Sequence, residues 1–362
     1  MSVRAPPIYL RPVCAGAWSV LGAALALLGG ACTKVPAPPP DCAAIDAGPA
    51  APKYPDDAYW PTPLRPAAHV VHAADVMGDL SLRGTDAFYR GAGGAIVRLP
   101  LGGGAPEVVA PACGDEHGRL AVDDRTVCCT EAVRGPAETR DRIVCLPRGG
   151  GARRVLREGL PSITSFALDA AQVYVGLVGI PGVARIRRSD GQLLTEPAQI
   201  PAQVAHICLD GEMVYWNSSG GIFGAPTRPS ASGERWQGPI SRGPIVVDAD
   251  SVYWSDGQDE DAAPRDDVIW KRDKARGSFV ALASGQYSVH YLGVTEKYVY
   301  WRTFSQALRR APKRGGPTET LGRNMDIRFL AGSGRQIYWE ELQGGRHTLF
   351  RLADDGEPRD GG

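Results

Sequence analysis

Three of the six histidines stand where they could hold a metal ion or act as acid and base. They lie 10, 8 and 9 residues before the apolar centres of three short segments: His117, His206 and His290. Asp115 and Glu116 directly precede the first of them. Imidazole and carboxylate groups that converge can bind a divalent metal or transfer protons. The alternative is that these are ordinary loop histidines on a polar surface.

The segments that follow the histidines belong to a repeat with an apolar residue, Tyr and Trp. Four clear copies are VYWNSS (214–219), VYWSDG (252–257), VYWRTF (299–304) and IYWEEL (337–342), and three weaker copies precede them. The apolar anchors follow one another at steps of 40, 46, 41, 38, 47 and 38 residues: Ala87, Val127, Val173, Val214, Val252, Val299 and Ile337. A repeat of this length must be interpreted before any single motif.

Each repeat has the same order of signals. An apolar strand ends in a turn, often with an Asp whose side chain can close the turn onto its own backbone: Asp123, Asp169, Asp210 and Asp248. The Tyr-Trp strand and two further strands follow. Four antiparallel strands per repeat predict an all-β, seven-bladed β-propeller over 67–362. The last repeat lacks its fourth strand, which we expect residues 67–75 to supply, closing the ring and removing an open edge.

The Tyr-Trp pairs are expected to fill the space between blades. Side chains alternate along a strand, so the Trp of each pair lies on one face and the Tyr on the other. The residues expected to pack in this way are Trp216, Trp254, Trp301 and Trp339. The competing interpretation is an aromatic cage for a ligand.

The repeats resemble those of bacterial secreted β-propellers with VYW strands, and VYWSD at 252–256 is similar to the YWTD blades of receptor ectodomains. The resemblance implies the propeller fold and an extracytoplasmic setting, and by itself it transfers no activity. In such propellers ligands usually meet the central channel where the innermost strands begin. The three histidines, Asp115 and Glu116 are therefore the candidate binding or metal rim.

The N-terminus has the features of an export signal. Residues 1–31 carry Arg4 and Arg11, then a short apolar run, then small residues. The ending LLGGAC resembles a bacterial lipobox, which makes Cys32 the expected lipidated residue; the alternative is ordinary cleavage after Ala31. Residues 32–66 are rich in Pro and Ala and are expected to tether the domain. The expected location is exported, as an outer-membrane lipoprotein facing the periplasm or the cell surface.

Four cysteines fall in the second repeat, where two of them replace the Tyr-Trp pair: Cys113, Cys128, Cys129 and Cys145. An exported chain occupies a compartment where disulfides persist. At least one disulfide is expected within this blade. Four thiols could instead bind zinc, although no CxxC pair is present.

Several functions and sites are not favoured. The 40 basic and 40 acidic residues balance, which argues against a nucleic-acid partner. The acidic loop at 255–267 lacks regular calcium-loop spacing, and the Gly-rich runs at 102–106, 148–153 and 314–318 are strand turns rather than phosphate sites.

The interpretation that follows is an envelope-anchored recognition or scaffold module for a protein, a glycan or a small molecule. It contacts the membrane only through the N-terminal lipid, and no cofactor is predicted beyond a divalent metal at the histidine rim. One alternative is a metal-assisted hydrolase or lyase of the lactonase-like propeller kind. Another is a purely structural envelope protein, which would carry no polar pocket on either face.

Overall fold

The computed structural model describes residues 65–114, 118–135, 138–194, 203–218, 221–228, 234–236, 241, 243–257 and 266–355. The chain divides into two compact units, Met1–Gly48 and Pro49–Gly362, and all described residues belong to the second. The signal segment, Cys32 and the tether up to residue 64 lie outside the described residues. Within the described part of the chain, no helix is both long and apolar enough to cross a membrane.

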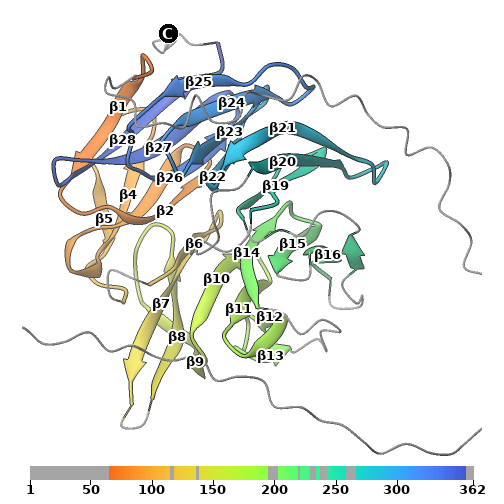
Figure 1. The fold of residues 1–362 in the computed structure, drawn as a ribbon. Helices are drawn as coiled ribbons and strands as arrows, with labels where there is room; N and C mark the ends of the chain where they lie inside the picture. Colours follow the sequence, from red (N-terminus) through yellow and green to blue (C-terminus); the bar gives the residue numbers. More distant parts are fainter. Residues whose placement is uncertain are drawn as a thin grey trace, which may run out of the picture. The chain divides into compact units, whose positions relative to one another are not determined.

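Seven four-stranded antiparallel sheets form the fold (Figure 1), together with one short 3-10 helix, η1 (Ala92–Gly94). Blade 1 holds β2 (Gly78–Arg83), β3 (Asp86–Arg90), β4 (Ile96–Pro100) and β5 (Glu107–Ala110). Blade 2 holds β6 (Leu120–Val122), β7 (Thr126–Arg134), β8 (Thr139–Pro147) and β9 (Arg154–Leu160). Blade 3 holds β10 (Ile163–Leu168), β11 (Gln172–Leu177), β12 (Ile180–Arg187) and β13 (Leu193–Leu194).

The other four blades repeat this order. Blade 4 holds β14 (Val204–Leu209), β15 (Met213–Ser218), β16 (Gly221–Pro226) and β17 (Glu234–Trp236). Blade 5 holds β18 (Ile245–Val247), β19 (Ser251–Ser255), β20 (Asp266–Asp273) and β21 (Phe279–Tyr287). Blade 6 holds β22 (Val289–Val294), β23 (Tyr298–Thr303), β24 (Leu308–Pro312) and β25 (Glu319–Gly322). Blade 7 holds β26 (Ile327–Ser333), β27 (Gln336–Gln343), β28 (Arg346–Ala353) and, from the start of the domain, β1 (His69–Ala74). The predicted seven-bladed propeller is confirmed.

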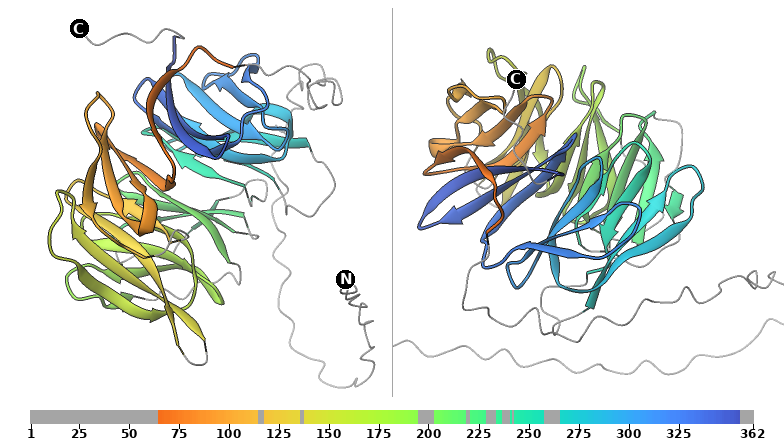
Figure 2. Two further views of the ribbon diagram at one scale, coloured as in Figure 1. Left: turned by 90° about the vertical axis from the view of Figure 1, so that its left-hand side faces the viewer. Right: turned by 90° about the horizontal axis from the view of Figure 1, so that it is seen from above.

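The ring closes through the two ends of the domain. The innermost strand of each blade contacts that of the next, including β26 with β2. β1 pairs with β28 from His69 opposite Arg351 to Ala74 opposite His347, and Figure 2 shows the orange β1 beside the blue C-terminal strands. Because β1 covers the outer edge of β28, that edge is not left to pair with another chain.

Each Tyr-Trp pair packs into two different interfaces between blades. The Trp301 ring packs beside Tyr253 of the preceding blade, and Trp339 packs beside Tyr300 in the same way. The pattern holds around the whole ring, since the Tyr position of one blade and the Trp position of the next share one apolar cluster at all seven interfaces. Trp254, Trp301 and Trp339 are buried, whereas Trp216 is partly exposed.

Disulfides take over this role in blade 2. Cys129 stands at the Trp position, faces blade 1 beside Phe88, and is bonded to Cys113. Cys128 stands at the Tyr position, faces blade 3 beside Val175, and is bonded to Cys145 on the neighbouring strand. The expected disulfide within this blade is confirmed, and all four thiols that could have bound zinc are used in the two bonds.

Replacing Trp301 with Ala should lower the free energy of unfolding by roughly 3 to 5 kcal/mol. The substitution empties a fully buried position and removes the 3.1 Å hydrogen bond from its indole N–H to Gln286. Trp216→Ala should cost clearly less, because Trp216 is only partly buried at its interface. Urea denaturation of both variants measures the difference, and equal losses would contradict this account of the interfaces.

Candidate functional site

His206 lies in a small cavity formed by the innermost strands of blades 1 to 4. The cavity has a volume of about 140 Å³, and its polar lining is Asp79, Arg119, Thr164, Ser165 and His206. Phe166 supplies an apolar wall. The backbone N–H of His206 donates to Asn217 Oδ1 at 2.9 Å, directly after a bulge in β14. This hydrogen bond fixes the position of the His206 backbone.

The imidazole of His206 is neutral at physiological pH. The residue keeps solvent-accessible surface, but the atoms of the neighbouring strands surround it closely enough to disfavour the charged ring. This burial, with the positive charge of Arg119, lowers the pKa of His206 to about 4. A neutral imidazole can donate one hydrogen bond and accept another.

His290 is not among the residues that line this cavity. It occupies the bulge of β22, and its ring lies 5.8 Å from the ring of Phe304. His117, Asp115 and Glu116 fall outside the described residues. Within the described chain, the one close group of metal-ligand residue types is Cys113, Cys129 and Glu131, whose cysteines are disulfide-bonded. Metal binding by the three histidines therefore stays a prediction.

Asp79 and Arg119 also line the cavity, although neither was among the residues predicted from the histidine spacing. Asp79 accepts a hydrogen bond from the Leu120 backbone N–H, and its φ of 41° places it in the left-handed region. Burial raises the pKa of Asp79 to about 6, although Arg119, that hydrogen bond and Arg90 oppose the rise. Their distance from the repeat anchors could have identified these residues. Asp79, Arg119, Ser165 and His206 all stand eight residues before their anchors. His290 stands nine before its anchor, at the bulged position of β22.

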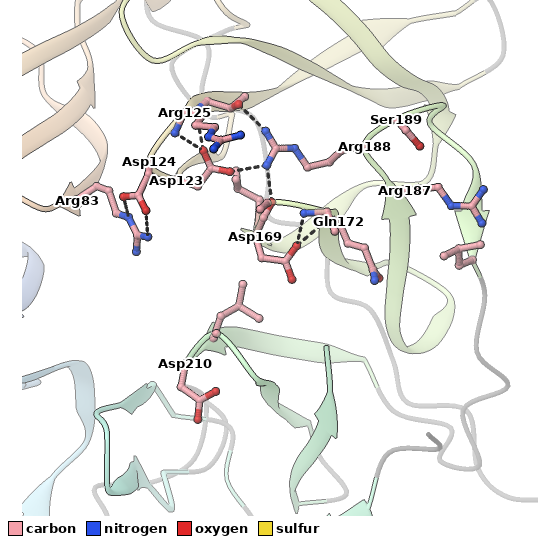
Figure 3. A pocket seen from close by; sticks show the side chains of 17 residues that line it. Arg83, Asp123, Asp124, Arg125, Asp169, Gln172, Arg187, Arg188, Ser189 and Asp210 are labelled. Carbon is pink, nitrogen blue, oxygen red and sulfur yellow. Dashed lines mark hydrogen bonds and ion pairs between the residues drawn. The ribbon is translucent and has the colours of Figure 1, made fainter. Parts of the chain in front are cut away.

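A larger groove lies on the opposite face, where the turns after the innermost strands meet (Figure 3). Its volume is about 1310 Å³, and it extends from Arg83 in blade 1 across the blade 2 and blade 3 turns to Asp210 in blade 4. Asp and Arg residues dominate its polar lining, with Leu168, Leu194 and Leu209 between them. None of the described residues that line it is aromatic.

The Asp turns hold this face together. In each turn one carboxylate oxygen accepts the backbone N–H groups two and three residues on, as Asp248 does from Asp250 at 3.0 Å and from Ser251 at 2.8 Å. The same geometry recurs in the turns of blades 2, 3 and 4, at Asp123, Asp169 and Asp210. The hydroxyl of Tyr253 donates to the second oxygen of Asp248 at 3.0 Å. The turn is therefore tied to its own Tyr-Trp strand.

A cation from the following blade completes three of these turns. Arg188 of blade 3 pairs with Asp123, Lys274 of blade 5 with Asp210 at 2.7 Å, and Lys313 of blade 6 with Asp248 at 2.6 Å. Burial acts against the carboxylate of Asp210 and of Asp248, but the paired Lys, the Tyr hydroxyl and the turn N–H together outweigh it and lower the pKa of both. We call these contacts the inter-blade ion pairs.

Most of the charged residues that line the groove form ion pairs. Figure 3 shows Arg83 against Asp124, joined by two bonds of 2.9 and 3.0 Å. In the same view Arg188 reaches between the Asp123 and Asp169 turns. The guanidinium of Arg125 has no ion pair among the described residues. The groove thus presents both signs of charge in fixed positions.

Comparisons with known proteins identify the fold and nothing more specific. No family model matches the chain, and no curated protein matches it. Among solved structures, virginiamycin B lyase from Staphylococcus aureus has 11% identity and a TM-score of 0.58, with 80% of this chain and 99% of that chain covered.

BamB from Moraxella catarrhalis has 13% identity and a TM-score of 0.51, covering 80% of this chain and 93% of that chain. The Cps50 (Swd1) β-propeller domain from Myceliophteria thermophila has 10% identity and a TM-score of 0.55, with 78% of this chain and 99% of that chain covered. Likeness at this level of identity shows a shared propeller fold.

The Asp248→Ala variant should lose roughly 3 kcal/mol of unfolding free energy at pH 7, because it leaves Lys313 half-buried without its partner. Asp169→Ala should lose less, since its carboxylate closes the turn and accepts from Tyr174 but has no cation paired with it among the described residues.

The loss should also depend on pH. The folded-state pKa of Asp248 is depressed, so its contribution is present above the unfolded pKa and disappears as pH falls through the folded value. Urea denaturation at pH 7 and at pH 3 should show the wild-type advantage over Asp248→Ala shrinking at the lower pH. An advantage that is constant across this range would argue against the ion pair as its source.

Proposed function

We propose that this protein is an envelope-anchored recognition module and that the groove on the Asp-turn face binds an extended polypeptide segment of a partner protein. The observation that carries the proposal is the groove itself, with about 1310 Å³ of volume and a fixed lining of mixed charge. Small-molecule sites usually have volumes of about 300 to 1,000 Å³. This groove is larger than that range and spans four blades, which suits a chain rather than a compact ligand.

The chemistry of the lining favours a peptide over a glycan. Sugar rings are commonly held by stacking on an aromatic side chain, and the described groove lining offers none. Paired charges of both signs favour a segment with its own acidic and basic residues, because complementary charges fix the register of such a complex. The polar pockets on both faces also argue against the purely structural alternative.

The location is part of the same proposal. The two disulfides indicate an oxidising environment. Residues 1–31 and the LLGGAC ending support export and lipid attachment at Cys32, with the propeller held at the outer membrane by the tether of residues 32–66.

The Arg125→Glu/Arg187→Glu variant should lose peptide binding. Both side chains are exposed in the groove lining, and the one ion pair that is lost, Arg187 with Asp190, is itself exposed. Reversing their charge should therefore change recognition with little effect on folding. The measurement is selection of a displayed 12-residue peptide library on the wild-type chain, followed by titration of the enriched peptides. At least a tenfold loss of affinity is expected for the groove variant.

The matched control is Arg276→Glu/Arg314→Glu, which reverses two exposed arginines on the turns between the third and fourth strands of blades 5 and 6, outside the groove. It should bind the enriched peptides as the wild type does. Equal binding by all three proteins, or a library that yields no enriched peptide, would rule out the groove as a peptide site.

The Cys32→Ser variant should move the protein from the membrane fraction to the soluble envelope fraction, because it removes the expected site of lipid attachment. Cys42→Ser provides the control, since it changes a cysteine in the same segment that the lipobox does not include. Fractionation of a Gram-negative host and the intact mass of the product give the result. An unlipidated wild-type protein that begins at Cys32 would show ordinary signal cleavage instead.

A further inference from the structure

Arg119 is an exposed cation that the backbone holds firmly in place. Its N–H donates to Thr130 Oγ1 at 2.7 Å, and its carbonyl accepts from the Thr130 N–H at 2.9 Å. The same carbonyl accepts from the buried Arg90 at 2.8 Å. Among the described residues, none forms an ion pair or hydrogen bond with the Arg119 guanidinium. The side chain therefore projects from a rigid base into the channel cavity, where the carboxyl of Asp79 is the one acidic group among the described lining residues.

Apart from the carboxyl of Asp79, the other cavity walls supply neutral hydrogen-bonding groups and one aromatic ring. His206 offers a neutral imidazole and Ser165 a hydroxyl. Thr164 already uses its hydroxyl, which donates to the Val204 carbonyl at 2.8 Å. Phe166 gives one side of the cavity an apolar surface. Several different polar groups that converge on one small space can fix the orientation of a bound small molecule.

We infer that this cavity binds a small organic carboxylate, with Arg119 as its counter-ion and the neutral His206 as a hydrogen-bond donor. A guanidinium matches the two oxygens of a carboxylate and can donate to both at once. The volume of about 140 Å³ admits a compact acid and excludes a peptide. The Phe166 wall favours an organic anion over an inorganic one. The site lies on the opposite face from the Asp-turn groove, so it does not depend on the proposed peptide binding.

Asp79 should make this binding depend on pH. The charged groups that act on it are Arg119 and Arg90, and the neutral His206 lines the same cavity. With the pKa of Asp79 raised to about 6, its carboxyl is mostly ionised at pH 7.5 and repels an anion. At pH 5.5 it is mostly protonated and the repulsion is relieved, while His206 remains neutral. Affinity should therefore rise as pH falls over this interval.

The experiment titrates the full chain with propionate, succinate and benzoate, using ligand-observed NMR at pH 7.5 and 5.5. Benzamide is the neutral comparison and inorganic phosphate the inorganic one. At least one carboxylate should bind saturably, more tightly at pH 5.5 than at 7.5, and more tightly than either comparison compound. Arg119→Gln should weaken it at least tenfold, which corresponds to about 1.4 kcal/mol.

Two further variants keep the test decisive. Asp79→Asn should tighten binding at pH 7.5 and remove the pH dependence, which a merely structural role of Asp79 would not do. Arg328→Gln removes another exposed arginine, which stands nine residues before the blade 7 anchor, whereas Arg119 stands eight before its own. Arg328 pairs with Asp326, and its replacement should leave binding unchanged. Melting temperatures of all variants show whether they fold.

Three outcomes would overturn the inference: no saturable binding of any carboxylate, equal binding by folded Arg119→Gln, or binding of phosphate as tight as that of the carboxylates. Binding of the groove-selected peptides should be unaffected by Arg119→Gln. Failure of the carboxylate site is therefore distinguishable from failure of the peptide site.

Discussion

The fold depends on one repeated contact, in which the Tyr position of each blade and the Trp position of the next share an apolar cluster. Tyr253 and Trp301 show the arrangement, because each is fully buried and they come from adjacent sheets. A single four-stranded sheet could not bury both of its faces by itself. Since adjacent residues on a strand point to opposite faces, one Tyr-Trp pair covers both faces of its sheet. The ring must close for every pair to be buried, and β1 provides that closure by pairing with β28.

Blade 2 shows that the constraint concerns volume and contact rather than aromatic character. Cys128 and Cys129 are smaller than Tyr and Trp, and each is joined by a disulfide to a second residue at the same interface. The bonded sulfur atoms fill space that a ring occupies elsewhere, and closing loops of 16 and 17 residues also restricts the unfolded chain. The two bonds thereby tie blade 2 to the segment after blade 1 and join its two middle strands.

The two faces of the ring use the repeat in different ways. On the turn face, Asp recurs at one position in four blades. These carboxylates close the turns, accept from tyrosine hydroxyls and form the inter-blade ion pairs. On the channel face, the residue eight before the anchor varies from Asp79 to Arg119, Ser165 and His206. The same backbone position in successive blades brings unlike side chains to one cavity. A symmetric fold therefore produces an asymmetric site, because only the side chains at that position differ.

By itself the sequence determined the features that depend on local order along the chain. The spacing of the anchors predicted seven blades, the missing last strand pointed to residues 67–75, and the cluster of cysteines indicated which blade carries disulfides. These follow from the strand period and from chain connectivity, which local residues encode. Contacts between blades join residues about 60 positions apart, such as Asp210 with Lys274, so only the tertiary structure decided them.

Tertiary structure likewise decided that Cys113 bonds to Cys129 and Cys128 to Cys145. It also decided that His206, Arg119 and Asp79 share a cavity which His290 does not line. The bulges at the starts of the innermost strands determine where each side chain points. His290 stands one position further from its anchor than His206 does, and this places its side chain outside the cavity. The spacing of the histidines alone does not reveal this difference, because it does not show where the bulges lie.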